Sequence, residues 1–187
     1  MTQAKNELTD EALIRLAQKG EMQATEQLIL RYGGLVRKLS RRYFLVGGET
    51  EDLIQEGMMG LFQATTDYKG GSSFKTFAYT CINRRMIDAV KSACAKKNEP
   101  LNFRVEAEED LAFDGIDPEE AIILSDDWRE MTAKMSRVLS DFEFKIFTMY
   151  MDGMTCAQIC AATGKTAKSV DNAIQRSKRK LQTIVSK

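Results

Sequence analysis

Apolar residues recur every three or four positions along much of this chain, and only two prolines interrupt its 187 residues. Such spacing places side chains on one face of an α-helix, because a helix has about 3.6 residues per turn. Apolar residues make up 43% of the chain, enough to build a buried core. The spacing is clearest at Ala24, Leu28, Tyr32, Leu35, Val36 and Leu39. The chain is therefore predicted to be all-α.

Residues that favour helix ends divide this pattern into separate helices. Thr9 is expected to cap the first helix, and Ser73 is expected to cap a long helix that starts at Phe74 and ends near residue 95. The capping-box spacing, a Ser or Thr followed three residues later by Glu or Gln, occurs at Ser140 and again at Thr155. Each signal marks a helix start that depends only on local sequence.

Charge is distributed unevenly, although lysines and arginines equal aspartates and glutamates at 27 each. Residues 1–95 carry 13 basic and 11 acidic side chains, residues 96–140 carry 6 and 12, and residues 141–187 carry 8 and 4. Within 106–130 there are 11 acidic residues and one basic residue. This pattern indicates two modules separated by an acidic connector.

The helical spacing is lost over residues 96–116, which locates the connector. It returns at Asp117, followed by Pro118 and two glutamates, a combination typical of a helix start. We therefore expect two small helical domains, at 1–95 and 117–187, joined by a flexible acidic linker.

Several classes of chemistry are excluded by composition. The chain has no histidine, which removes histidine acid–base catalysis and most zinc sites. Cys81, Cys94, Cys156 and Cys160 form no C-x-x-C pair and are expected to be reduced thiols. No apolar stretch is long enough to span a membrane or to act as a secretory signal. We expect a cytoplasmic protein with no metal site.

The C-terminal region has the layout of a helix-turn-helix, with a short helix ending at Thr163, a break at Gly164 and a second helix from Thr166. One face of the second helix could enter a major groove and present side chains to base edges. The side chains on that face are Ala167, Lys168, Asp171, Asn172 and Gln175, with Arg176, Lys178 and Arg179 available for phosphates. The alternative is an amphipathic helix with a solvated basic end.

Aromatic and basic residues alternate in the long central helix. Rings can stack on unpaired bases while cations hold the backbone, so the pattern suits a melted strand. The residues concerned are Phe74, Lys75, Phe77, Arg84, Arg85 and Lys91. The alternative is that Phe74 and Phe77, three residues apart, simply belong to the core.

Together these segments resemble a bacterial RNA polymerase sigma factor of the alternative type. Residues 52–61 (DLIQEGMMGL) resemble the family's polymerase-binding motif. Residues 74–87 resemble its promoter-melting and −10-reading helix, and residues 154–181 its −35-reading helix-turn-helix. Tyr43-Phe44 and the DPEE segment at 117–120 are most similar to the sporulation-type sigma-H group.

The resemblance implies region 2 at 1–95 and region 4 at 117–187, and a factor that directs promoter-specific transcription initiation. It also implies a protein that is not an enzyme and has no catalytic residue or cofactor of its own. Its implied partners are promoter DNA and core RNA polymerase, through the clamp helices of the largest subunit and the flap of the second-largest subunit. The family also allows an anti-sigma factor.

The resemblance also implies specific site residues. The implied polymerase-binding residues are Asp52, Leu53, Gln55, Glu56 and Met58. Those implied for −10 recognition and melting are Phe74, Lys75, Phe77, Arg84, Arg85, Asp88 and Lys91.

The chain departs from housekeeping sigma factors at positions that read bases. Arg84 and Ile87 occupy the positions of the family's −10 readers, and Ala167 and Lys168 stand where the −35 helix usually has Arg and Glu. Both promoter elements should therefore differ from the housekeeping sequences.

Two other functions fit parts of the sequence. A stand-alone transcriptional regulator would use only the helix-turn-helix, and would leave residues 52–61 and the aromatic helix without a role. An enzyme acting on nucleic acid would need a carboxylate cluster, but the acids at 106–130 lie in a segment without regular spacing.

Overall fold

The structure is a computed structural model that describes residues 8–43, 50–97 and 126–185. These ranges contain helices and turns and no strand, so the predicted all-α class is confirmed. None of the described helices is long and apolar enough to cross a membrane. The helices are α1 (Asp10–Ala17), α2 (Met22–Arg42), α3 (Thr50–Asp67), α4 (Phe74–Lys97), α6 (Asp126–Val138), α7 (Asp141–Met151), α8 (Cys156–Thr163) and α9 (Ala167–Val185).

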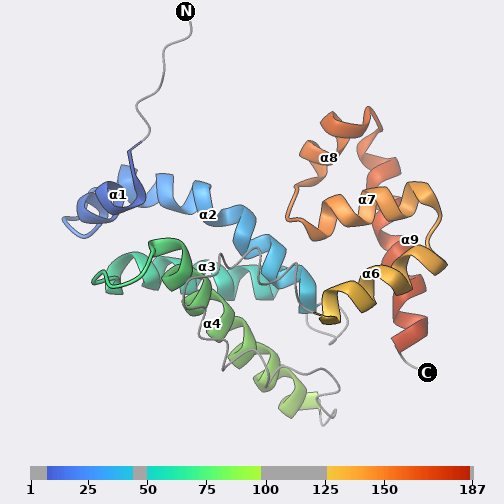
Figure 1. Cartoon of the computed structure of the whole chain (residues 1–187), viewed down its shortest axis with the longest axis horizontal. Coiled ribbons are helices and arrows are strands. Elements are labelled where there is room, and N and C mark those ends of the chain that lie inside the picture. Colours follow the sequence, from blue (N-terminus) through green and yellow to red (C-terminus); the bar gives the residue numbers. More distant parts are fainter. Residues whose placement is uncertain (1–7, 44–49, 98–125, 186–187) are drawn as a thin grey trace, which may run out of the picture.

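The first four helices pack around a single apolar core, and α6–α9 form a second group beside them (Figure 1). Thr9 caps α1 by accepting a hydrogen bond from the Ala12 amide at 3.3 Å. Phe74 lies between two tyrosine rings, with ring centroids 5.2 Å from Tyr32 and 5.4 Å from Tyr68. The start of α4 is thereby fixed against α2 and against the end of α3.

Helices α3 and α4 approach each other closely because two glycines of α3 face α4. A Cβ atom on Gly60 would lie 2.9 Å from the backbone oxygen of Cys81 and 3.0 Å from the Cα of Ile82. A Cβ atom on Gly57 would lie 2.2 Å from the side chain of Met86. Glycine at these positions lets the two helices pack closely against each other.

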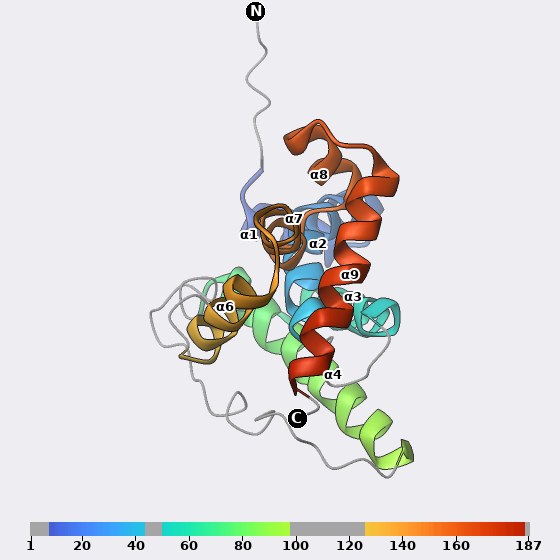
Figure 2. The same ribbon diagram turned by 90° about the vertical axis from the view of Figure 1, so that its right-hand side faces the viewer.

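The second domain is built on α7, which contacts α6, α8 and α9 (Figure 2). Ile146 and Phe147 of α7 are fully buried, each in its own apolar cluster. Both predicted capping boxes are present: the Glu143 amide donates to Ser140 Oγ, and the Gln158 amide donates to Thr155 Oγ1.

The boundaries agree only in part with the predicted organisation. Helix α4 continues to Lys97, two residues into the predicted linker at 96–116. The remainder of that linker and the predicted helix start at Asp117 lie outside the described residues. The predicted domain limits therefore stay a prediction.

Candidate functional site

The helix-turn-helix is formed by α8, a three-residue turn and α9. Gly164 ends α8 in the left-handed region, at φ 67°, where glycine carries no steric cost. The hydroxyl of Thr166 then caps α9 by accepting from the Ser169 amide at 3.3 Å. The break and the cap are both at the predicted positions.

The two faces of α9 are divided as predicted. Its inner residues are buried, and they are Val170, Ala173, Ile174, Ser177 and Leu181. Its predicted base-reading residues are all exposed, and they are Ala167, Lys168, Asp171, Asn172 and Gln175. Amide, ammonium and carboxylate groups on one exposed helix face have the chemistry needed to distinguish base pairs.

The cations near the end of α9 are not equivalent. Glu143 of α7 is almost fully buried and binds two of them, Arg176 through Nε at 3.1 Å and Lys180 through Nζ at 2.7 Å. Lys178 lies over the ring of Tyr150, with its Nζ 5.1 Å from the centroid. Arg179 is exposed. The structure therefore places Arg176 and Lys178 in internal contacts and leaves Arg179 as the better candidate for a phosphate.

Glu143 connects the start of α7 to the middle of α9. The hydrogen bond from Lys180, with those from the Ser140 amide and Arg176, lowers the pKa of Glu143 from 4.5 to about 2. Because the folded pKa lies below the unfolded one, the carboxylate stabilises the fold above about pH 4.5. This contribution is lost as the pH falls from 4.5 towards 2.

We expect Glu143→Gln to destabilise the second domain by up to about 3 kcal/mol at pH 7. The difference in the free energy of unfolding between this variant and the unaltered chain should shrink as the pH is lowered from 5 to 3. Protonation of the native carboxylate then removes its stabilising contribution. Urea unfolding at a series of pH values measures this. Glu26→Gln, at an exposed position of α2, should show no such convergence. A difference that stayed constant with pH would contradict the assignment.

The predicted polymerase-binding residues of α3 do not share one face. Asp52 and Gln55 are exposed, whereas Leu53 is buried in the core and cannot contact a partner. Met58 is half-buried and packs on the same core. The prediction was wrong for Leu53, because its side chain points to the inner face of α3.

Glu56 is half-buried and forms an ion pair with Arg85 of α4, with Oε2 and Nε 2.8 Å apart. Arg85 also donates to the sulfur of Met59, at 3.6 Å. Arg85 was predicted to contact DNA, but the structure brings it to the outer side of α3 instead.

Two exposed residues on the outer face of α3 were not predicted. Met59 is 44% exposed and Phe62 is 57% exposed, at seven and ten residues from Asp52. Positions 52, 55, 59 and 62 follow helical spacing, so they lie on one face. The spacing of apolar residues alone places Phe62 in the core, because the helix is apolar on more than one side. We call Asp52, Gln55, Met59 and Phe62 the α3 outer face.

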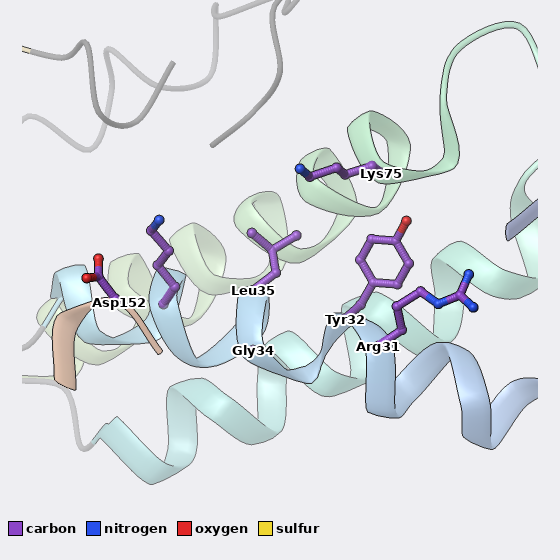
Figure 3. A pocket seen from close by; sticks show the side chains of 7 residues that line it. Arg31, Tyr32, Gly34, Leu35, Lys75 and Asp152 are labelled. Carbon is purple, nitrogen blue, oxygen red and sulfur yellow. The ribbon is translucent and has the colours of Figure 1, made fainter. Parts of the chain in front are cut away.

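Along α4 the predicted DNA-binding residues fall on two sides. Arg84 and Asp88 are exposed, and Phe77 and Lys91 are half-buried beside them. Lys75 lies nine residues before Arg84, half a turn around the helix, and lines a pocket with residues of α2 such as Tyr32 and Leu35 (Figure 3). The structure thus separates Lys75 from the exposed strip that contains Arg84.

The structure corrects the predictions made for one aromatic and one aliphatic residue of α4. Phe74 is only 1% exposed, so its ring cannot stack on a base, and the core alternative is right for this residue. Ile87 is also buried, which leaves Arg84 as the exposed member of the two predicted −10 readers. Phe77 is half-buried, with its centroid 5.5 Å from that of Tyr68, so part of its ring is accessible.

Comparison with known proteins gives a consistent result for both halves of the chain. Residues 28–94 match the family described as Sigma-70 region 2, and residues 133–181 match Sigma-70, region 4. The RNA polymerase sigma-H factor of Bacillus subtilis (strain 168) is 38% identical over 192 residues, covering 94% of this chain and 88% of the relative. That of Bacillus licheniformis is 36% identical, covering 94% and 86%. The ECF RNA polymerase sigma-E factor of Escherichia coli (strain K12) is 26% identical, covering 96% and 95%.

Proposed function

The chain belongs to the sigma-70 family of RNA polymerase sigma factors, and from this premise we propose how its surfaces divide the work of initiation. It is an alternative sigma factor that directs promoter-specific transcription initiation. We propose that the α3 outer face binds core polymerase, that α4 opens and reads the −10 element, and that α9 reads the −35 element.

The observation that carries this proposal is the division of α9. Its potential base readers are exposed together, while the opposite side of the same helix is buried in the second domain. Only side chains that reach base edges can discriminate sequence, whereas phosphate contacts set position and overall affinity. The chain itself is proposed to carry no catalytic group and to act on DNA through the polymerase.

The α9 proposal is tested by distinguishing side chains that contact bases from side chains that contact phosphates. Lys168→Ala or Gln175→Ala should change the preference at one or two −35 positions by about 1–3 kcal/mol. Arg179→Ala should weaken all promoters alike and reduce the salt slope by about 0.9 for each phosphate that is no longer neutralised. The measurement is binding of the holoenzyme to a −35 library at several salt concentrations. If all three variants lost the same binding affinity at every −35 sequence, the proposed division between base contacts and phosphate contacts would be contradicted.

On α4, we propose that the accessible part of Phe77 stacks on an unpaired base of the −10 element. Arg84 and Asp88 lie on the neighbouring exposed strip, where they could contact bases or backbone. The proposed polymerase contacts of α3 are with the clamp helices of the largest subunit, and region 4 is proposed to bind the flap.

Phe77→Ala should leave binding to core polymerase and closed complexes normal but reduce promoter opening. Losing one base stack should cost about 1–3 kcal/mol. This corresponds to a roughly 5- to 150-fold decrease in the ratio of open to closed complexes. Permanganate reactivity of thymines in the −10 region measures opening. Thr80→Ala, at an exposed position one turn away, is the control. If the Phe77 variant opened the promoter normally, the proposed stacking would be contradicted, and the Phe77 ring would have only a structural role in the core.

A further inference from the structure

Helix α1 ends beside the end of α3 (Figure 1), and one side chain joins the two ends. Gln18 follows the last residue of α1, and its Nε2 donates hydrogen bonds to three backbone carbonyls. The acceptors are Thr65 and Thr66, both at 3.3 Å, and Tyr68 at 2.8 Å. They lie 47–50 residues further along the chain. Gln18 therefore caps a helix other than its own, and we call this contact the Gln18 cap.

The Gln18 cap binds groups that α3 leaves without partners. The last carbonyls of an α-helix have no amide partner within the helix and carry its partial negative charge, so an N–H donor stabilises them. The Ala64 carbonyl still accepts from the Tyr68 amide, at 3.1 Å. The carbonyls of the next two residues accept from Gln18 instead. A side-chain amide suits this place because it offers two N–H groups, whereas a carboxylate would be repelled.

Tyr68 connects the Gln18 cap to the start of α4. Its carbonyl accepts from Gln18, and its hydroxyl donates to the carbonyl of Ser72. Its ring packs against two aromatic rings of α4, with centroids 5.4 Å from that of Phe74 and 5.5 Å from that of Phe77. The cap on α3 is therefore linked through one tyrosine to the half-buried ring of Phe77.

The loop between α3 and α4 needs such contacts because its own backbone is permissive. Gly70 and Gly71 have φ angles of 90° and 99°, and a Cβ atom on either would meet nothing within 4 Å. Glycine loses more conformational freedom on ordering than any other residue. The loop is held instead at its two ends, by Gln18 and Tyr68 at one and by Ser73, which caps α4, at the other.

We propose that Gln18 is a positioning residue for promoter opening. By capping α3 it fixes Tyr68, and Tyr68 holds the ring of Phe77 where an unpaired base can stack on it. This assignment rests on the stacking role proposed for Phe77. It gives a function to α1, which precedes the part of the chain that matches Sigma-70 region 2. Gln18 acts through Phe77 and makes no contact of its own with DNA.

The energetic reason is pre-organisation. A base that stacks on a ring already held in place avoids the cost of ordering that ring and its loop on binding. The net effect of one hydrogen bond on an equilibrium is about 2- to 12-fold. Losing the Gln18 cap should therefore lower the ratio of open to closed complexes by about this factor. Closed complexes should form normally, because no base is unpaired in them.

Three substitutions of Gln18 test the cap against a matched control. Gln18→Ala removes the donor. Gln18→Glu keeps the shape but replaces the donor with a carboxylate, which the carbonyls of α3 repel. Gln18→Arg supplies N–H donors again. Lys19→Gln is the control, because it lowers the net charge by one at the end of α1, as Gln18→Glu does, but changes an exposed neighbour instead.

Hydrogen exchange in the free, full-length chain measures the cap itself. The amides in the last turn of α3, residues 65–68, should exchange faster in Gln18→Ala and fastest in Gln18→Glu, because the turn opens more often. Gln18→Arg and Lys19→Gln should exchange as the unaltered chain does. Unchanged exchange in both Gln18→Ala and Gln18→Glu would overturn the cap. Circular dichroism checks that each variant is folded at the temperature of the measurement.

Promoter opening by the holoenzyme tests the positioning role. Permanganate reactivity should show a drop of about 2- to 12-fold in Gln18→Ala, a larger one in Gln18→Glu, and none in Gln18→Arg or Lys19→Gln. Binding to core polymerase and closed complexes should be unchanged in all four. Normal opening despite faster exchange would overturn the positioning role, and so would a loss that Gln18→Arg fails to restore.

A double variant decides whether Gln18 acts through Phe77. In the Phe77→Ala background, Gln18→Ala should cause no further loss of opening, because residues that act through one another are not additive. Additive losses would overturn the proposed route through Phe77. If Phe77→Ala alone opened the promoter normally, the stacking role of Phe77 would be rejected instead, and hydrogen exchange at the end of α3 would still decide the Gln18 cap.

Discussion

Replacing Met59 and Phe62 together with alanine is expected to weaken binding to core RNA polymerase by roughly 30-fold or more, with the fold intact. Both side chains are large, apolar and about half exposed, and they lie beside Asp52 and Gln55 on the α3 outer face. Truncating a side chain that is a hot spot of an interface costs about 2 kcal/mol or more in binding free energy. Truncation should cost little stability, because neither side chain is buried in the core.

The matched control is the double variant Met22→Ala with Leu30→Ala on α2. These side chains are 84% and 74% exposed, so the control removes a similar apolar surface from the same domain. Fluorescence anisotropy of labelled protein titrated with core polymerase gives both affinities. Equal losses in the two double variants, or no loss in the α3 variant, would contradict the assignment of the α3 outer face.

Replacing Gly60 with alanine is expected to destabilise the first domain by about 2 kcal/mol or more, although alanine favours helices over glycine. The added Cβ would meet backbone atoms of Cys81 and Ile82 at 2.9–3.0 Å, and backbone cannot move aside as a flexible side chain can. Helices α3 and α4 would have to separate. The melting temperature should fall by roughly 8–16 °C for a domain of this size.

Gly34→Ala is the matched control, because it makes the same substitution within α2. A Cβ there would meet only the end of the Arg37 side chain, at 3.9 Å. It should stabilise the chain by about 0.5–1 kcal/mol, the ordinary gain of alanine over glycine within a helix. Thermal unfolding followed by circular dichroism compares the two. If Gly60→Ala were also stabilising, the close approach of α3 and α4 would be disproved.

Much of the fold follows from local signals in the sequence. The caps at Thr9, Ser140 and Thr155 and the break at Gly164 are all where they were predicted. Each depends on hydrogen bonds within three or four residues, so no knowledge of the rest of the fold is needed. The inner and outer faces of α9 were also predictable, because its apolar residues form one stripe.

The faces of α3 and α4 were less predictable. Helix α3 has apolar residues on two sides, and spacing alone could not show that Leu53 is buried while Phe62 is exposed. The Phe74 ring was open to two interpretations, and only its contacts with Tyr32 and Tyr68 decide for the core. Such choices depend on which helix packs against which, and that is a property of the tertiary fold.

The contact between domains had no sequence signal at all. Arg37 and Arg41 bind residues more than 100 positions away, and the groups they bind are backbone carbonyls. Carbonyls are present in every residue, so no pattern of side chains marks them. Exposed arginines on a helix are ordinarily solvated, and the burial of Arg41 becomes visible only when the second domain is placed.

The central claim, that this chain directs initiation through polymerase, is tested most directly by transcription from fragmented genomic DNA of its own organism with purified core enzyme. Sequencing of transcript 5′ ends should reveal discrete, shared start sites only when the chain is added to core. Footprinting with the chain alone should show no specific protection. Specific protection by the chain without polymerase, together with no new start sites in its presence, would contradict the account and favour a stand-alone regulator.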